Sequence, residues 1–485
     1  MLYDLIIRDA LVIDGSDTPG FRADVAIHDG RILRIGNLVD ASAAGEIDAA
    51  GRVLAPGFID VHTHDDTVVI RQPDMLAKIS QGVTTVIVGN CGISASPVSL
   101  KGAPPDPMNL LGAQQHFVYP RFRDYRDAVD EARPAVNVAA LVGHTALRNN
   151  HLDDLFRSAS PDEIAAMREQ LRDSLEDGAL GLSTGLAYAS AFCAETTEVA
   201  QLAEELGAFG AVYTTHLRSE FEPVLEAMDE AFGIARHARA PVIISHLKCA
   251  GAGNWGRSPQ LLAALEQAAQ SHPVGCDCYP YAASSSTLDL KQVTDAFRIT
   301  ITWSTPHPEQ SGRDLQEIAA DWQLPLLDAA RQLQPAGAVY YGMDEQDVER
   351  ILSHPLSMIG SDGLPEDPFP HPRLWGAFPR VLGHFSRDKG LFPLHGAVHK
   401  MTGLSAARFG LHERGLIREG FHADLVLFDA ERVIDIADFK QPMRAAAGID
   451  AVWVNGHLSY ADGQARGERQ GRFLPRSGSL REGFG

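Results

Sequence analysis

Residues 57–66 read GFIDVHTHDD and place two histidines, His62 and His64, one residue apart at the end of an apolar run. Alternate residues of a β-strand face the same side of the backbone, so both imidazoles are expected to point in one direction. Two neighbouring imidazoles can share a metal ion, hold an anion, or lie at a solvated strand end. The motif alone is weak evidence, and the other strand ends of the chain must decide between these interpretations.

Short apolar runs like this one recur along the chain, and most are followed by a helical pattern. The segment SPDEIAAMREQLRDSLEDG opens with Ser160-Pro161 as helix cap and first-turn residue and ends before Gly178, and SPQLLAALEQAAQ repeats this opening. Eight runs predict an α/β fold, a (β/α)8 TIM barrel, with a doubly wound open sheet as the alternative. The runs are GFIDVHTH, VTTVIVGNC, VNVAALVGH, LGLSTGL, AVYTTHLR, PVIISHLK, PVGCDCYPY and LSMIGSD.

Polar or reactive residues gather at the carboxyl ends of these runs. In a barrel the loops at that face build the pocket, so residues there are expected to be site residues. One histidine at a strand end is usually structural, but this many at matching ends favours a metal site. The residues are His62, His64, Cys91, His144, His216, His246 and Asp362.

Both ends of the chain are rich in strand patterns, and neither end is large enough for a core of its own. We therefore expect a small β-sandwich domain formed from residues 1–56 and 412–475. The barrel then occupies residues 57–411. A long interruption between the last two barrel strands, at about 282–355, is interpreted as a lid over the barrel mouth.

Composition limits the classes of partner. The formal charge is −21, from 63 acidic and 42 basic residues, which argues against nucleic acid and against an anionic membrane. No apolar run is long enough to span a bilayer, and the first residues alternate like a strand rather than a signal peptide, so a cytoplasmic location is expected. The five cysteines favour free thiols over a disulfide framework. The oligomeric state is left undetermined.

The combination of HTH on the first run, single histidines ending two middle runs and SDG ending the last resembles the amidohydrolase superfamily. The bridging lysine usual on the fourth strand of that superfamily is missing, because the run reads GALGLSTGL. Instead, GNCGIS supplies Cys91 from the second run. Together with STGLAY, THLRSE, SHLKCAG and GSDG, this is similar to the N-acyl-D-amino-acid deacylase branch over nearly the whole chain. The resemblance implies zinc-dependent hydrolysis of the amide bond of N-acyl-D-amino acids, and the D-stereochemistry rests on it alone.

The chemistry of the residue types agrees with zinc. Imidazole and thiolate suit Zn²⁺, and one Cys with two His leaves a coordination position for water or substrate. Cys91, His216 and His246 are assigned to a tightly bound zinc. A second site would use His62, His64 and Asp362, with Cys91 bridging, and its occupancy is left open.

Amide hydrolysis needs a base that takes a proton from water and returns it to the leaving nitrogen. Asp362 is the carboxylate at a ligand-rich strand end and receives this role, and Tyr188 is a candidate hydrogen-bond donor to the scissile carbonyl.

The substrate is expected to be a small anion. The resemblance implies that its α-carboxylate is bound by Lys248, Tyr279, Ser285 and Arg373. Arg298, the one charge in the apolar stretch DAFRITITW, is expected either to bind an acidic substrate side chain such as that of D-glutamate or to face solvent.

Three other functions stay open at this point. A cyclic amidase of the dihydroorotase or hydantoinase kind would normally carry the missing lysine. A dipeptidase would need groups for an α-amino group. A barrel with a purely structural zinc would usually close the metal with four ligands that lie near each other in sequence.

Overall fold

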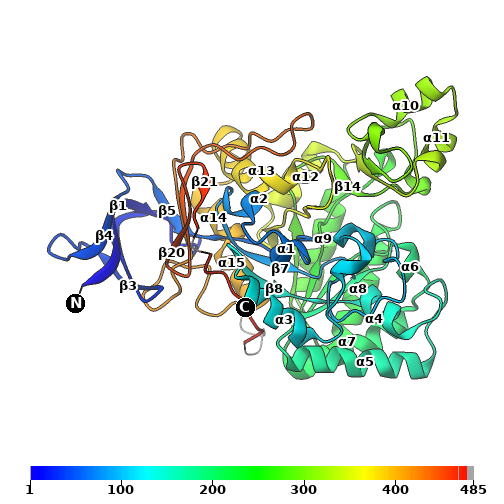
Figure 1. The fold of residues 1–485 in the computed structure, drawn as a ribbon, viewed down its shortest axis with the longest axis horizontal. Helices are drawn as coiled ribbons and strands as arrows, with labels where there is room; N and C mark the ends of the chain where they lie inside the picture. The colour runs from blue at the N-terminus through cyan, green and yellow to red at the C-terminus, as the bar shows by residue number, and fades with distance from the viewer. Residues whose placement is uncertain (1, 468, 478–485) are drawn as a thin grey trace.

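The centre of the molecule consists of parallel strands, as the runs predict. The computed structural model describes residues 2–467 and 469–477, and Figure 1 shows its fold. One sheet has three parallel strands and another has six, in the order β17-β13-β12-β11-β10-β9. The strands are β6 (Phe58–Asp60), β7 (Val83–Val88), β8 (Asn137–Ala140), β9 (Val142–Gly143), β10 (Gly181–Gly185), β11 (Val212–His216), β12 (Val242–Ile244), β13 (Val274–Cys278) and β17 (Ser357–Ile359).

The two parallel sheets meet at both of their edges. On one side, β8 and β9 are separated only by Leu141, whose N–H donates to Val88 O at 2.9 Å. On the other side, Thr63 pairs with Gly363 in a parallel bridge just beyond β6 and β17. The N–H of Asp362 also donates to His62 O at 2.7 Å. The carboxyl ends of the first and last strands therefore lie side by side.

Both faces of these strands are buried, as is usual for parallel sheets. Along β7, Val86 and Val88 join one hydrophobic cluster, whereas Ile87 between them joins another. The cluster with Ile87 also takes residues from other parallel strands: Ile59, Ala139, Val212, Ile243 and Met358. This alternation follows from the two-residue period of a strand.

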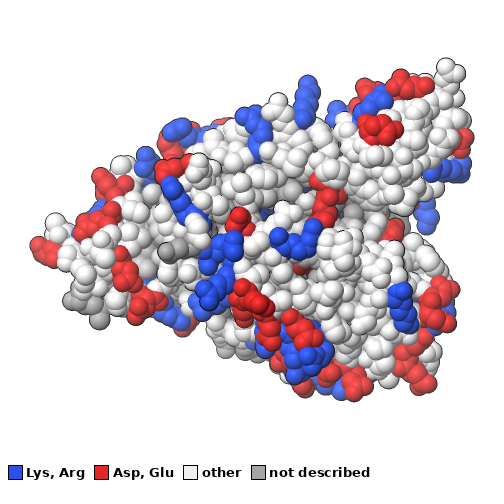
Figure 2. All heavy atoms as spheres, in the orientation of Figure 1, with Lys and Arg blue, Asp and Glu red and all other residues white. Residues whose placement is uncertain are grey.

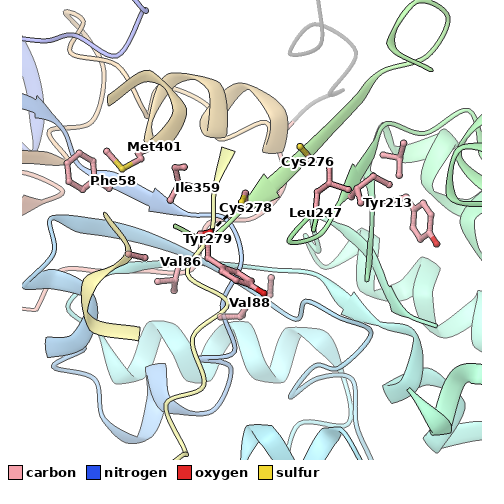
Figure 3. Close-up of a cluster of buried hydrophobic side chains, with 14 of the residues drawn as sticks. Phe58, Val86, Val88, Tyr213, Leu247, Cys276, Cys278, Tyr279, Ile359 and Met401 are labelled. Carbon is pink, nitrogen blue, oxygen red and sulfur yellow. Dashed lines mark hydrogen bonds between the residues drawn. The ribbon is translucent and has the colours of Figure 1, made fainter. Parts of the chain in front are cut away.

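The cysteines of β13 take part in the other cluster. Figure 3 shows Cys276 and Cys278 with Phe58, Val86 and Ile359, which come from β13, β6, β7 and β17. Burial raises the pKa of Cys276 to about 12, which keeps it a neutral thiol. All five cysteines are free, as the sequence predicts.

Helices follow most of the strands. The capping box expected at Ser160 is present, since the Ser160 side chain accepts from the Glu163 N–H and the Glu163 side chain reaches back to Ser160. The second helix of this kind starts at Ser258, but its hydroxyl donates to Asp347 instead of capping the helix. The helices are α1 (Val68–Arg71), α2 (Leu76–Ile79), α3 (Phe122–Ala132), α4 (His144–His151), α5 (Pro161–Glu176), α6 (Ala189–Phe192), α7 (Thr196–Phe209), α8 (Val224–Ala238), α9 (Ser258–Ala269), α12 (Glu345–Ser353), α13 (Arg373–Arg380), α14 (Leu394–Met401) and α15 (Gly403–Phe409).

Strands from both ends of the chain form one nine-stranded sheet, at the left of Figure 1. β5 and β18 join the two ends in antiparallel pairing, with Leu54 opposite Leu427. The sheet has a hydrophobic cluster of its own that includes Ile7, Val25 and Trp453. Its strands are β1 (Tyr3–Val12), β2 (Phe21–His28), β3 (Arg31–Gly36), β4 (Ala43–Asp48), β5 (Val53–Pro56), β18 (Leu425–Phe428), β19 (Ile449–Val454), β20 (His457–Ala461) and β21 (Gln464–Ala465).

The excursion expected at 282–355 contains a small antiparallel sheet with two helices, far from the N-terminus in Figure 1. Ile301, Leu315 and Leu333 belong to its separate hydrophobic cluster. The last helix in this range, α12, packs on α9 and β17 instead of on the small sheet. The elements of the excursion are β14 (Ser284–Thr287), β15 (Ile299–Ser304), α10 (Leu315–Trp322), α11 (Leu326–Leu333) and β16 (Ala336–Tyr340).

Acidic and basic side chains are mixed over the face shown in Figure 2, with no continuous basic surface there. Among the described residues, no helix has the length and apolar character needed to cross a bilayer.

Candidate metal centre

The structure brings together all six side chains that the sequence analysis assigns to metal. Their ligand atoms form two groups that share one thiol, and within each group the atoms lie within 4.8 Å of one another. The first group is Cys91, His216 and His246, and the second is His62, His64, Cys91 and Asp362. Each residue ends or follows a parallel strand, so neighbouring strands deliver them to one point.

The shared thiol lies between two imidazoles. Cys91 Sγ is 3.2 Å from His62 Nε2 and 3.3 Å from His246 Nε2. Burial alone would raise the pKa of the Cys91 thiol, but His62 and His246 lower that pKa well below its ordinary value. The site therefore favours the thiolate, which is the form that binds metal.

Asp362 lies between the imidazoles and a guanidinium. Its Oδ1 is 3.1 Å from His64 Nε2, and its Oδ2 is 2.9 Å from an Arg373 nitrogen. Burial would raise the pKa of this carboxyl, but Arg373, with help from His64, lowers the pKa well below its usual range. The group is a carboxylate at neutral pH.

Three of these residues have left-handed backbones that are uncommon for residues with a side chain. Cys91 has φ 53°, His246 has φ 36° and Asp362 has φ 49°. Such conformations cost on the order of 1–3 kcal/mol each and persist where the surroundings fix them. Here each one turns the chain sharply at the end of a strand, which keeps the side chain at the centre of the site.

Two buried carboxylates that the sequence analysis missed touch the metal-binding imidazoles. Asp277 Oδ2 lies 3.3 Å from His62 Nδ1, and its Oδ1 accepts the backbone N–H of His246 at 2.9 Å. Glu220 lies 2.9 Å from His246 Nδ1 and forms an ion pair with Lys248. Asp277 had a usable signal, because a carboxylate in the middle of a fully buried strand needs a partner.

A cavity of about 520 Å³ opens onto the site. His216, His246 and Asp362 line it together with four residues predicted to act on substrate: Tyr188, Lys248, Tyr279 and Ser285. The Tyr188 and His216 rings are 4.8 Å apart between centroids. Burial raises the pKa of the Tyr188 phenol well above its usual value, so the group keeps its proton.

Arg373 lies fully buried beside this cavity and has unused donors. Its Nη2 donates to Ser285 O at 3.1 Å, and its guanidinium carbon lies 4.5 Å from the Tyr279 ring centroid. Nε and Nη1 have no hydrogen-bond partner within the described chain, and neither does the Ser285 hydroxyl. Unpaired buried donors are costly, so this arrangement suits a ligand that carries an anionic oxygen.

Two residues named in the sequence analysis lie elsewhere. Arg298 does not line the cavity, because its Nε pairs with Asp314 at 3.4 Å and its guanidinium stacks on Tyr341 at 4.0 Å. His144 is not among the ligand groups, since its Nε2 lies 2.9 Å from Glu198 Oε1 in a buried ion network with Arg148. A strand-end position alone therefore does not make a histidine a ligand.

The donor set fits zinc. Thiolate and imidazole are the ligand types that zinc prefers, and each group offers at least three of them. The buried Nδ1 atoms of His64 and His216 also have no hydrogen-bond partner among the described residues.

Comparison with known proteins gives consistent matches over nearly the full chain. A model described as the amidohydrolase family matches residues 45–460. A D-aminoacylase from Alcaligenes xylosoxydans xylosoxydans is 49% identical over 475 residues, which cover 98% of both chains. An N-acyl-D-aspartate deacylase from the same organism is 48% identical over 97% of this chain and 95% of its own. An N-acyl-D-glutamate deacylase structure from Bordetella bronchiseptica, with zinc and a phosphonate mimic of the tetrahedral intermediate, has TM-score 0.95 and 44% identity, covering 98% of this chain and 100% of that one.

Proposed function

The chain belongs to the amidohydrolase family, and we propose that it is a zinc-dependent deacylase that hydrolyses the amide bond of N-acyl-D-amino acids. The products are a carboxylic acid, acetate in the simplest case, and a D-amino acid. The relatives that share about half of its residues over the full length carry deacylase names.

The observation that carries the proposal is the buried guanidinium of Arg373. An N-acyl amino acid has a free α-carboxylate next to the scissile amide. Arg373 Nε and Nη1 have no hydrogen-bond partner among the described residues, and its Nη2 lies 2.9 Å from Asp362 Oδ2. This arrangement supports an anion site next to a hydrolytic centre, and an intact hydantoin ring has no carboxylate that would use such a site. A purely structural zinc would have no need of the cavity.

Zinc would be held by Cys91, His216 and His246, and a second metal ion would use His62, His64 and Asp362 with the shared thiolate. When bound, zinc supplies a water activated at neutral pH and polarisation of the amide carbonyl.

Asp362 moves the proton. Its carboxylate takes a proton from the attacking water and delivers it to the departing nitrogen. Arg373 keeps Asp362 ionised before the reaction, so the group starts as the base. Tyr188 keeps its phenolic proton and donates to the carbonyl oxygen as charge develops there.

The α-carboxylate lies against Arg373, with Ser285, Tyr279 and Lys248 around it. Arginine suits this role because its guanidinium stays charged and carries several hydrogen-bond donors, of which Nη2 is already engaged by Asp362 and Ser285 O. Lys248 adds positive charge, and Glu220 fixes its ammonium. In a protein of net charge −21, these cations attract the anionic substrate locally.

The two parallel sheets form one (β/α)8 barrel in this proposal. The parallel pairing of Thr63 with Gly363 and the near-continuity of β8 and β9 support closure, as does the hydrophobic cluster shared by their strands. The nine-stranded sheet then forms the second domain, from residues 1–56 and 412–475. The excursion at 282–355 acts as the lid, with its small sheet as the moving part.

A cytoplasmic location and the absence of nucleic-acid partners stay predictions from composition.

The anion site can be tested directly. We expect Arg373→Met to lower kcat/KM for N-acetyl-D-leucine by at least about 100-fold, the usual scale for removing one partner of a buried charge pair. For the same substrate with an α-carboxamide, the wild type should already be poor, and the variant should lose less than it does on the acid because only the contact with Asp362 is removed.

Arg380→Met, on the same helix α13, is the matched control. Arg380 donates to Pro280 O at 2.8 Å and pairs with Asp435, away from the ligand groups. Its kcat/KM should stay near wild type. If Arg373→Met lowered kcat/KM equally for the acid and for the amide, the role of Arg373 in binding the α-carboxylate would be contradicted.

A further inference from the structure

Lys78 is a fully buried lysine directly behind the candidate metal centre. It lies on the four-residue helix α2, and its side chain has no solvent exposure. It is not a metal ligand and does not line the cavity. An ammonium in such a place must have partners, since burying an unpaired charge is very costly.

Four side-chain oxygens surround this ammonium. Lys78 Nζ lies 2.8 Å from Asp60 Oδ2, 2.9 Å from Thr63 Oγ1 and 3.2 Å from Asp65 Oδ2. These three residues alternate with His62 and His64 along one segment. The fourth partner is the Ser361 hydroxyl at 2.9 Å, and Ser361 immediately precedes Asp362.

The same partners also fix the backbone of both segments. Asp60 Oδ1 accepts the N–H of His62 at 3.3 Å and the N–H of Ser361 at 2.8 Å. Ser361 Oγ accepts the N–H of Gly363 at 3.1 Å. A single buried cluster therefore ties the segment with His62 and His64 to the segment with Asp362. Within the described structure, no hydrogen bond or ion pair joins the Lys78 ammonium to Cys91, His216 or His246.

Stability alone is a weak explanation for this cluster. A buried ion pair loses much hydration free energy, and hydrophobic residues of the same volume are often as stabilising. Apolar residues, however, could not hold two loops in a defined register, because this requires directional hydrogen bonds. Asp362, with its left-handed backbone, lies on one of these loops.

We propose that Lys78 is a positioning residue for the reaction: its ammonium binds the His62–His64 segment to the Ser361–Asp362 segment and so sets the Asp362 carboxylate relative to the two imidazoles. The inference rests on the proposed function for its kinetic consequence. Its metal-binding consequence is independent of the substrate. The group Cys91, His216 and His246 should not depend on Lys78.

The first test is Lys78→Met in the full chain. In the zinc-loaded enzyme we expect kcat to fall about 10–100-fold with KM little changed, the scale usual for groups that orient metal-site residues. In the cobalt-substituted protein, the thiolate-to-metal charge-transfer absorption of the first equivalent should be retained. Binding of the second equivalent should weaken, also by about 10–100-fold.

A milder pair of variants covers the case in which Lys78→Met fails to fold. Ser361→Ala removes one link between the segments and leaves the Lys78–Asp60 ion pair, so kcat should fall about 10-fold. Ser245→Ala is the matched control, because Ser245 precedes His246 as Ser361 precedes Asp362. The Ser245 hydroxyl is buried without a hydrogen-bond partner in the described structure, and its loss should leave kcat unchanged.

The outcomes separate the two proposals. Failure of the wild type to release amine from any N-acyl-D-amino acid would reject the proposed function, and the cobalt titration would still decide the role of Lys78. Unchanged kcat per folded molecule in Lys78→Met, or equal effects of Ser361→Ala and Ser245→Ala, would overturn the positioning role. Loss of the thiolate-to-metal absorption in Lys78→Met would also overturn the positioning role, because it would show that the whole metal centre was disrupted.

Discussion

Arg373 and Arg298 are the two arginines that the sequence analysis considers for substrate binding, and their surroundings are opposite. Arg373 is fully buried, and two of its nitrogens have no hydrogen-bond partner in the part of the chain that the structure describes. The Arg298 side chain is 48% exposed, lies on the excursion, and pairs with Asp314. The sequence analysis assigned Arg373 to the α-carboxylate by resemblance and left Arg298 open between an acidic substrate side chain and solvent. Arg373 contacts Tyr279 and Ser285, which line the cavity, whereas Arg298 pairs with Asp314 and does not line the cavity.

The preference for an acidic or an apolar substrate side chain depends on whether Arg298 can reach the cavity. If Arg298 pairs with an acidic substrate side chain, Arg298→Met should lower kcat/KM for N-acetyl-D-glutamate by about 10–100-fold and leave N-acetyl-D-methionine almost unaffected. Arg313→Met, in the same excursion and paired with Asp321, is the control. An unchanged ratio of the two substrates would assign Arg298 to the surface of the excursion only.

Among the elements, the strand ends were the most predictable part of the site. Parallel strands place their carboxyl ends at one edge, so a histidine, cysteine or aspartate there was expected to meet its counterparts, and six such residues did. Asp277, Glu220 and Lys78 were missed because they support the ligands from other positions. Lys78 comes from a helix of only four residues, too short to give a periodic signal. His144 was predicted to be a site residue but is not among the ligand groups, because its imidazole pairs with the buried Glu198 of α7.

That network between α4 and α7 makes the stability of the protein depend on pH. Glu198 is bound by His144 and Arg148; burial opposes its ionisation, but these partners lower the pKa of Glu198 to about 2. A carboxyl whose pKa is lower in the folded state stabilises it above the unfolded pKa of about 4.3 and loses this effect as pH falls toward 2. Glu198→Gln should therefore cost about 3 kcal/mol of unfolding free energy at pH 7 and much less near pH 3.

Urea unfolding of wild type and variant at both pH values measures this difference. Glu205→Gln is the control: its arginine partners, Arg168 and Arg172, are partly exposed, so about 1 kcal/mol or less is expected. A Glu198→Gln cost that is the same at pH 7 and pH 3 would contradict the pKa assignment.

For the whole molecule, the pairing of the two chain ends in one sheet could be anticipated, because each end has strands without enough core. The C-terminal boundary of the excursion could not be anticipated from the sequence. α12 belongs to the parallel strands through its contacts with α9 and β17, and these contacts exist only in three dimensions. The net charge of −21 was similarly uninformative about the site, where the placement of a few cations matters more than their number.

The most direct test of the central claim is amine release from matched N-acetyl-D- and N-acetyl-L-amino acids, with Glu, Asp, Leu and Met as side chains. Zinc-loaded wild type, Asp362→Asn and the control Asp367→Asn should be compared. Asp367 is a buried carboxyl outside both ligand groups and outside the cavity lining, so its amide variant should keep activity. We predict turnover of D-substrates only, reduced about 10²–10⁴-fold in Asp362→Asn with zinc retained. Comparable turnover of L-substrates, or full activity in Asp362→Asn, would contradict the account.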